Sequence, residues 1–277
     1  MRRKICLIIL FLLVLLAIFF LEYKFIDKPK AVVGNTTTIV LEGKTITFTE
    51  FGVDNFTSTG LSFDERNNTF WIGDYGTAES ADVQTPRVVE VNKDLNKVLR
   101  IVDLSNILSN CDNLQGVSWD QTNDSLWLAV GDSCKNINKD GTLISEFELG
   151  KYKKYKSNGI CVDKDSLWVL CYSKYLLHYK KSGTLLKEYK VNFKDQDMLF
   201  NSGNELLITV GADYNGESNY VVSFDKNTGK IRVKYQTIGS YAVEGLSIVD
   251  GKMYIVNDGL YHDAKIKESY FAIYDLK

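Results

Sequence analysis

The chain has 277 residues, of which 45% are hydrophobic and 25% are charged, a composition typical of a folded globular protein. Its formal net charge is −2, and neither half of the chain is strongly basic, which argues against binding to nucleic acid. The chain contains 16 tyrosines, 14 phenylalanines and many β-branched residues, which favour pleated strands.

The N-terminus carries a hydrophobic segment long enough to cross a membrane. Three basic residues precede the uncharged run Ile5–Leu21, and a membrane span needs roughly 17–25 residues. Because the basic residues come first, the positive-inside rule predicts a cytoplasmic tail (1–4), a membrane anchor (5–23), a tether (24–35) and a domain outside the cytoplasm (36–277). The alternative is a cleaved signal peptide and a secreted protein, although no small-x-small cleavage site follows the run.

An internal repeat runs through the rest of the chain. Five segments share a short alternating strand, a polar turn and a second apolar strand, and they begin at Gly60, Gly116, Gly159, Asp197 and Gly245. Successive starts differ by 56, 43, 38 and 48 residues, close to the roughly 40–50 residues of one four-stranded propeller blade. The sequence therefore predicts an all-β protein, a β-propeller of five blades preceded by one transmembrane helix. A sixth, degenerate blade in residues 31–58 is the alternative.

The last predicted blade lacks a strand. Only one outer strand, Tyr270–Tyr274, follows its inner hairpin. The stretch Thr36–Phe51 is strand-like and belongs to no blade, so we expect it to complete the last blade and close the ring. Closure matters because an open ring would expose strand edges that pair with other chains.

Two sets of side chains are expected to be buried in the blades. An aromatic residue recurs at one position of the second strand, where packing between blades is expected: Trp71, Trp127, Trp168 and Tyr254. Cys161 and Cys171 lie in the inner strands of the third blade but not opposite each other, so both are expected to be free thiols.

Two further cysteines flank the inner hairpin of the second blade. If the register of that hairpin continues outward, Cys111 and Cys134 face one another and can meet disulfide geometry. The oxidising side of the membrane would permit the bond. We therefore expect a disulfide between Cys111 and Cys134.

Two polar positions recur in each predicted blade. The first immediately precedes the start of the repeat: Thr59, Gln115, Asn158, Gln196 and Glu244. The second lies at the end of the partner strand: Asp74, Asp132, Ser173, Asp213 and Asp258. Strand starts and partner-strand ends share one face of a propeller, so we expect these side chains to converge at one mouth of the central tunnel.

A mouth rich in carboxylates, amides and carbonyls is a hard-oxygen environment, and Ca²⁺ takes about 6–8 oxygen ligands. We expect Ca²⁺ or another divalent cation, or a small ligand, at this mouth. The expected metal ligands are Glu244, Asn158, Asp213 and Asp132, and the expected ligand-binding residues are Asp74, Gln115, Gln196 and Asp258. The two histidines share no ligand spacing, which argues against zinc. Each Asp taken alone can instead form a turn, whereas Glu244 is a poor turn-former and is the first choice.

The segments Ser157–Ile160 and Val243–Leu246, with Asp at the partner-strand ends, resemble the regucalcin/gluconolactonase family. The combination of Glu244-Gly245-Leu246 with Val256-Asn257-Asp258-Gly259 is still more similar to the SdiA-regulated family of bacterial propellers. In the gluconolactonase relatives, a Glu, an Asn and an Asp from different blades hold one divalent metal that polarises a lactone or ester. The resemblance implies metal ligation by Glu244 and Asn158, and it implies that Asp213 is the catalytic Asp.

The sequence leaves two functions open. The first is a binding or sensing propeller at the cell surface, with a small ligand or Ca²⁺ at the tunnel mouth. The second is a metal-dependent hydrolase of lactones or esters, in which the metal is the Lewis acid. No nucleophile–base pair is readable in the sequence, and many propellers only bind, which favours the first.

Overall fold

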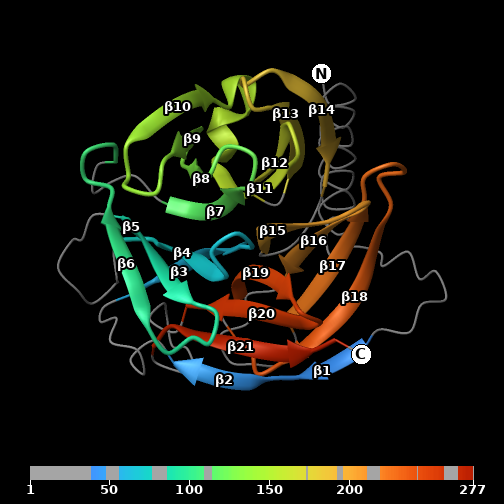
Figure 1. Cartoon of the computed structure of the whole chain (residues 1–277). Coiled ribbons are helices and arrows are strands. Elements are labelled where there is room, and N and C mark those ends of the chain that lie inside the picture. The colour runs from blue at the N-terminus through green and yellow to red at the C-terminus, as the bar shows by residue number, and fades with distance from the viewer. Residues whose placement is uncertain are drawn as a thin grey trace, which may run out of the picture. The chain divides into compact units, whose positions relative to one another are not determined.

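In a computed structural model the chain forms an all-β, five-bladed propeller (Figure 1). The structure describes residues 39–47, 56–76, 86–108, 114–172, 174–191, 196–210, 219–241, 243–258 and 268–276. Within these ranges no helix is long and apolar enough to cross a membrane. The predicted tail, anchor and tether all lie outside the described residues.

Each blade has four antiparallel strands, and blade 4 has one added parallel strand; the innermost strand lies nearest the centre of the ring in Figure 1. Blade 1 comprises β3 (Ser58–Asp64), β4 (Thr69–Asp74), β5 (Arg87–Asn92) and β6 (Val98–Asp103). Blade 2 comprises β7 (Leu114–Asp120), β8 (Ser125–Val130), β9 (Ser133–Ile137) and β10 (Leu143–Glu148). The 3₁₀ helix η2 (Gly150–Tyr155) leads into blade 3, which comprises β11 (Ser157–Asp163), β12 (Ser166–Cys171), β13 (Tyr175–Lys180) and β14 (Leu185–Lys190).

The last two blades take up the N-terminal strands. Blade 4 comprises β15 (Gln196–Ser202), β16 (Glu205–Val210), β17 (Asn219–Asp225), β18 (Ile231–Ile238) and β1 (Ile39–Glu42). Blade 5 comprises β19 (Val243–Val249), β20 (Lys252–Asn257), β21 (Tyr270–Asp275) and β2 (Lys44–Thr47). We call the face where the inner strands begin the mouth face. The opposite face carries the inner hairpin turns, and we call it the turn face.

The N-terminal strands confirm the expected closure of the ring. Strand β2 pairs antiparallel with β21 as the outer strand of blade 5, so the alternative of a sixth blade is wrong. The strand before it, β1, joins a different blade, which the sequence did not predict. It pairs in parallel with β18 and covers the outer edge of blade 4. One short stretch of chain therefore joins two neighbouring blades.

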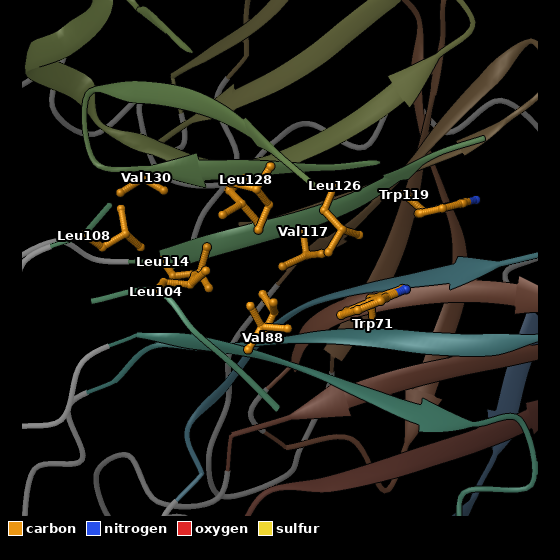
Figure 2. Packing of buried hydrophobic residues seen from close by; sticks show 12 residues of the cluster. Trp71, Val88, Leu104, Leu108, Leu114, Val117, Trp119, Leu126, Leu128 and Val130 are labelled. Atoms are coloured by element: carbon orange, nitrogen blue, oxygen red, sulfur yellow. The ribbon is translucent and has the colours of Figure 1, made fainter. Parts of the chain in front are cut away.

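The core lies between the faces of neighbouring blades. Figure 2 shows this for blades 1 and 2, where Trp71 and Val88 face Leu126, Leu128 and other side chains of the next sheet. The recurring aromatic residues are buried as predicted: Trp71, Trp127, Trp168 and Tyr254. Each buried side chain of this size contributes about 1.5–3 kcal/mol relative to exposure, so packing between blades is the main stabilisation of the ring.

The repeated glycine allows the inner strands to approach backbone to backbone. A Cβ atom at Gly60 would lie 2.2 Å from the backbone nitrogen of Val117 in the next blade. A Cβ atom at Gly245 would likewise lie 2.2 Å from the backbone nitrogen of Leu61. No side chain fits at these distances, so glycine is required for sterically close packing around the axis.

Ion pairs between blades recur on the turn face. An Asp in the inner hairpin of one blade meets a Lys from the turn between the third and fourth strands of the next blade. The pairs are Asp64–Lys139 (3.1 Å), Asp120–Lys181 (2.6 Å), Asp163–Lys226 (2.7 Å) and Asp250–Lys93. Asp64 and Asp120 are fully buried, and breaking their pairs would leave an uncompensated charge. Asp250 is mostly exposed, so its pair with Lys93 contributes little.

The cysteines correct one prediction and confirm another. The expected register of the second hairpin holds at Trp119, which pairs with Leu126. The chain then reverses at Gly131 (φ 53°), so Cys134 lies in the next strand, β9, opposite Ala129. Cys134 is a free, fully buried thiol, and the expected disulfide is therefore wrong. Its predicted partner, Cys111, lies outside the described residues.

The other two cysteines behave as expected. Cys161 and Cys171 are buried free thiols. Burial raises the pKa of each thiol to about 12. Neither thiol is therefore a reactive thiolate near neutral pH.

Candidate functional site

Each inner hairpin contains a β-bulge near the mouth face, where the inner strand carries one residue more than its partner. In blade 1, Thr59 and Gly60 together lie opposite the single residue Gly73. The pairing shifts at the same place in the other hairpins, after Leu114, Ser157, Gln196 and Val243. A bulge changes the direction of a side chain and is common next to active sites. The polar residues that precede the glycines therefore lie at bulges.

The register of blade 4 changes one expected member of this set. Gln196 pairs with Val210, as Ser58 pairs with Asp74 in blade 1, so it lies one residue before the bulge. Asp197 takes the bulge position instead. The physical reason is the hairpin turn, which falls at Gly203 (φ 62°), one residue later than the repeat predicted. We call the five residues at these positions the bulge ring: Thr59, Gln115, Asn158, Asp197 and Glu244.

The bulge ring combines hydroxyl, amide and carboxylate groups. Thr59 and Asn158 are buried, whereas Gln115 and Glu244 are half-buried. The Thr209 hydroxyl donates a hydrogen bond to the Glu244 carbonyl (3.0 Å) and so holds the bulge of blade 5. The glycine contacts bring the inner strands together directly beside the ring. The ring therefore places polar residues at the start of the inner strands, next to the close contacts between them.

The described members of the second expected set differ in register. Asp74 pairs with Ser58, but the residues in the equivalent places are Val130, Cys171, Val210 and Asn257. Asp74 is buried and forms an ion pair with Arg87 (2.5 Å). It also accepts hydrogen bonds from the backbone N–H groups of Thr57 and Gly76, both at 3.1 Å. Burial raises the pKa of Asp74 above its ordinary value, although Arg87 opposes this shift. These contacts give Asp74 a structural role.

The remaining members of this set are dispersed. Asp132 is exposed in the turn after β8, and Asp258 is buried directly after β20. Ser173 and Asp213 lie outside the described residues. Loops of different length follow the partner strands, so polar residues at the ends of these strands do not occupy equivalent positions in the blades. Among the described residues, no group of three His, Cys, Asp or Glu side chains converges on one point.

The junction of blades 5 and 1 holds buried polar atoms that the sequence repeat did not single out. Thr57, Ser58 and Thr59 are at most 5% exposed, and their hydroxyls make no hydrogen bond within the described residues. We call them the junction hydroxyls. A buried polar group without a partner costs about 1–3 kcal/mol, so three in succession call for an explanation.

The neighbouring blade contributes a further such atom. The Oδ1 atom of Asn257 is buried and makes no hydrogen bond within the described chain. Asn257 pairs with Tyr270, and the adjacent Ser269 hydroxyl accepts the Ser58 N–H (3.1 Å). The same hydroxyl donates to the Phe56 carbonyl (2.5 Å). Ser269 thus links the strand that pairs with Asn257 to the start of β3, which carries the junction hydroxyls. In the sequence, the run of three hydroxyl residues Thr57-Ser58-Thr59 before the first repeated glycine could have indicated this group.

The fold and this arrangement define a five-bladed β-propeller with a polar mouth face, and known structures agree on the fold. Glutaminyl cyclase from Myxococcus xanthus has a TM-score of 0.61 at 10% identity, covering 87% of this chain and 100% of its own. The WD40 repeats of RRP9 have a TM-score of 0.52 at 6% identity, covering 84% of this chain and 97% of theirs. At these identities the likeness concerns the fold alone. No protein-family model matches the sequence, and no curated protein is significantly similar to it.

Proposed function

We propose that this protein is a binding or sensing propeller that takes a small polar ligand on its mouth face. The observation that carries the proposal is the set of buried junction hydroxyls that make no hydrogen bond within the described chain. Thr59 belongs both to the junction hydroxyls and to the bulge ring, so a ligand rich in hydroxyl or amide groups at this position could bind groups of both sets. The predicted anchor over residues 5–23 would hold this face outside the cytoplasm.

A Ca²⁺ ion fits the chemistry of the same groups. The bulge ring contains the Glu244 carboxylate, the Asn158 and Gln115 amides and the Thr59 hydroxyl, and Ca²⁺ is bound by oxygen ligands of these kinds. These are oxygen donors from three neighbouring junctions of the propeller. The ion would bind as part of the ligand or as a structural support for the mouth face.

The test is a thermal-shift screen of the full-length protein in detergent. The probes are Ca²⁺ and a panel of polyols, sugars and free amino acids. A bound probe raises the melting temperature, because it binds only the folded state. We expect Glu244→Gln and Thr59→Val to abolish that rise. The matched control is Glu65→Gln, which removes the same charge from an exposed residue of the turn face. A panel without any shift, or shifts that all variants share, would overturn the proposal.

Metal-dependent hydrolysis of a lactone or ester is the second candidate. It is supported by Glu244 and Asn158, which lie at bulges of two different blades as the resemblance to gluconolactonases requires. The five blades differ from the six that are usual in that family. An aryl-ester and lactone panel with added Ca²⁺, extended by a glutaminyl peptide because of the structural likeness, tests this candidate. Turnover by the wild type that Glu244→Gln abolishes would favour an enzyme over a binding protein.

A further inference from the structure

The mouth face also carries a group of lysines that the proposed ligand site does not use. Four of them lie in and directly after η2, which connects β10 to β11, and the fifth lies in the turn between β12 and β13. Both connections are on the mouth face, because β11 begins there and β12 ends there. We call this group the lysine patch: Lys151, Lys153, Lys154, Lys156 and Lys174. We propose that it binds an anionic polymer that carries repeated phosphate groups.

The η2 segment is held rigidly against blade 3. Leu149 and Tyr152 are buried in the core between blades 2 and 3. The Leu149 N–H donates to the Asp132 carbonyl (2.9 Å), and the Ser157 N–H donates to the Gly131 carbonyl (2.6 Å). Both ends of the segment are therefore fixed, and the entropy lost on binding is small for the backbone of the patch.

Tyrosine rings hold several of the ammonium groups. The Lys154 and Lys174 Nζ atoms lie 5.0 and 5.7 Å from the centre of the Tyr155 ring. Lys151 Nζ lies 4.9 Å from the centre of the Tyr152 ring. A cation over an aromatic face is attracted by about 0.5–1 kcal/mol at exposed sites. These contacts restrict the lysines to one region without neutralising them.

The charges of the patch are mostly uncompensated. Lys151 forms an ion pair with Glu188 (2.9 Å), but the other four lysines form no ion pair within the described residues. On the turn face Lys139, Lys181 and Lys226 are each paired with an Asp, whereas Lys97, Lys164 and Lys230 also form no ion pair within the described residues. The patch differs in that its lysines gather, as Lys154 and Lys174 do at the Tyr155 ring. Unpaired like charges repel one another, and a bound polyanion would relieve that repulsion. Two exposed carboxylates, Asp132 in the turn after β8 and Glu148 at the end of β10, lie on the mouth face.

The layout favours a polymer over a single anion. The lysines come from two separate connections on an exposed surface, so one small anion could contact only part of the set. A chain of linked phosphates can contact several lysines in succession and release its counterions. Lys156 is two residues from Asn158, so such a chain would run along the edge of the bulge ring.

The test measures binding of long-chain inorganic polyphosphate to the full-length protein by fluorescence anisotropy across a salt series. The patch variant is Lys153→Gln/Lys154→Gln/Lys156→Gln. The control is Lys97→Gln/Lys164→Gln/Lys230→Gln, which removes three exposed charges from the turn face. We expect the patch variant to raise Kd at least tenfold and to reduce the slope of log Kd against log salt by about two. The control should change Kd less than twofold.

Three results would overturn the proposal: no binding of polyphosphate by the wild type, equal losses in both triple variants, or equal inhibition by orthophosphate at matched phosphate concentration. Binding only to phosphatidylglycerol vesicles would also contradict it and would indicate a membrane-contacting surface. If the patch triple variant does not fold, Lys154→Gln/Lys174→Gln tests the same surface with two changes. Glu244→Gln should leave polyphosphate binding unchanged, so the patch and the ligand site can fail separately.

Discussion

The turn face and the mouth face of the propeller present different kinds of polar contact. On the turn face, buried Asp side chains each meet a Lys of the next blade, as in the pair Asp120–Lys181 (2.6 Å). On the mouth face, the junction hydroxyls are just as buried but make no hydrogen bond within the described residues. Four of the five lysines of the patch likewise form no ion pair within the described residues.

We relate this difference to two roles of polar groups, which are stabilising the fold and binding another molecule. Polar groups that stabilise a fold are expected to be satisfied by other groups of the fold. Groups that the fold leaves unsatisfied are candidates for contacts with another molecule, and the junction hydroxyls of the mouth face are three such groups in succession. The turn face therefore holds the blades together, and the mouth face is where we place binding. Three pairs of substitutions test this division. The first concerns the close packing of the inner strands around the axis.

The largest effect is expected from Gly60→Ala. The new Cβ atom would lie 2.2 Å from the Val117 backbone nitrogen, so two inner strands would have to separate. We expect the free energy of unfolding to fall by about 3 kcal/mol, measured by urea denaturation. Gly203→Ala is the control, because nothing lies within 4 Å of its Cβ position and only its φ of 62° is strained. It should cost about 1 kcal/mol, and equal losses would refute the close-packing argument.

A smaller effect is expected on the turn face from Lys226→Met. Lys226 contacts the Asp163 carboxylate (2.7 Å) and the Gly203 carbonyl (2.7 Å). The Asp163 side chain is 21% exposed, so we expect a loss of about 2 kcal/mol at pH 7, below the range for fully buried pairs. Lys230→Met, at an exposed position of the same turn, should change stability by less than about 0.5 kcal/mol.

The same pair predicts a pH dependence. Burial disfavours the Asp163 carboxylate, but hydrogen bonds and charge from Lys226 outweigh it and hold the pKa of Asp163 below its ordinary value. The stabilisation is therefore complete above the unfolded pKa of about 3.9 and is lost as pH falls through the lower, folded pKa. The wild type should lose more stability than Lys226→Met as the pH is lowered below 4. Parallel curves for the two proteins would argue against the pair.

The smallest effects come from two buried serines that differ in their partners. The Ser118 hydroxyl accepts the Val162 N–H (2.9 Å) from the next blade, whereas the Ser58 hydroxyl makes no hydrogen bond in the described chain. Ser118→Ala should cost about 1–2 kcal/mol because it leaves a buried donor unsatisfied. Ser58→Ala should not lower stability, because it removes a buried hydroxyl that has no partner in the described chain, and it should weaken ligand binding. A large loss of stability in Ser58→Ala would show that this hydroxyl serves the fold.

Sequence reasoning reached the fold, and the site residues that it proposed stay a prediction. The spacing of the repeat predicted five blades, and the strand-like N-terminal stretch predicted closure. Thr59, Gln115, Asn158 and Glu244 were identified because a polar residue before a glycine recurred in each blade. Asp197 was missed, because blade 4 has no glycine at the repeat position and its hairpin turn falls one residue later.

The remaining errors share a physical cause. The disulfide failed because a turn at Gly131 redirects Cys134 into β9, and a register cannot be extended past an unseen turn. The lysine patch was missed although Gly150–Lys156 is visibly rich in Lys and Tyr. A run of lysines alone does not reveal whether acidic partners lie nearby, since those partners come from distant parts of the chain.

The sequence by itself determined the number of blades, the glycines at the axis and the polar character of the residues beside them. These features are local or periodic, so they can be recognised within a single sequence repeat or from the spacing of the repeats. Only the tertiary structure decided which polar groups are satisfied, because Asp–Lys pairs and hydroxyl acceptors join residues from different blades. It also decided that β1 joins blade 4 while β2 joins blade 5. The Asp–Lys pairs of the turn face and the junction hydroxyls of the mouth face can be recognised only from these contacts between blades.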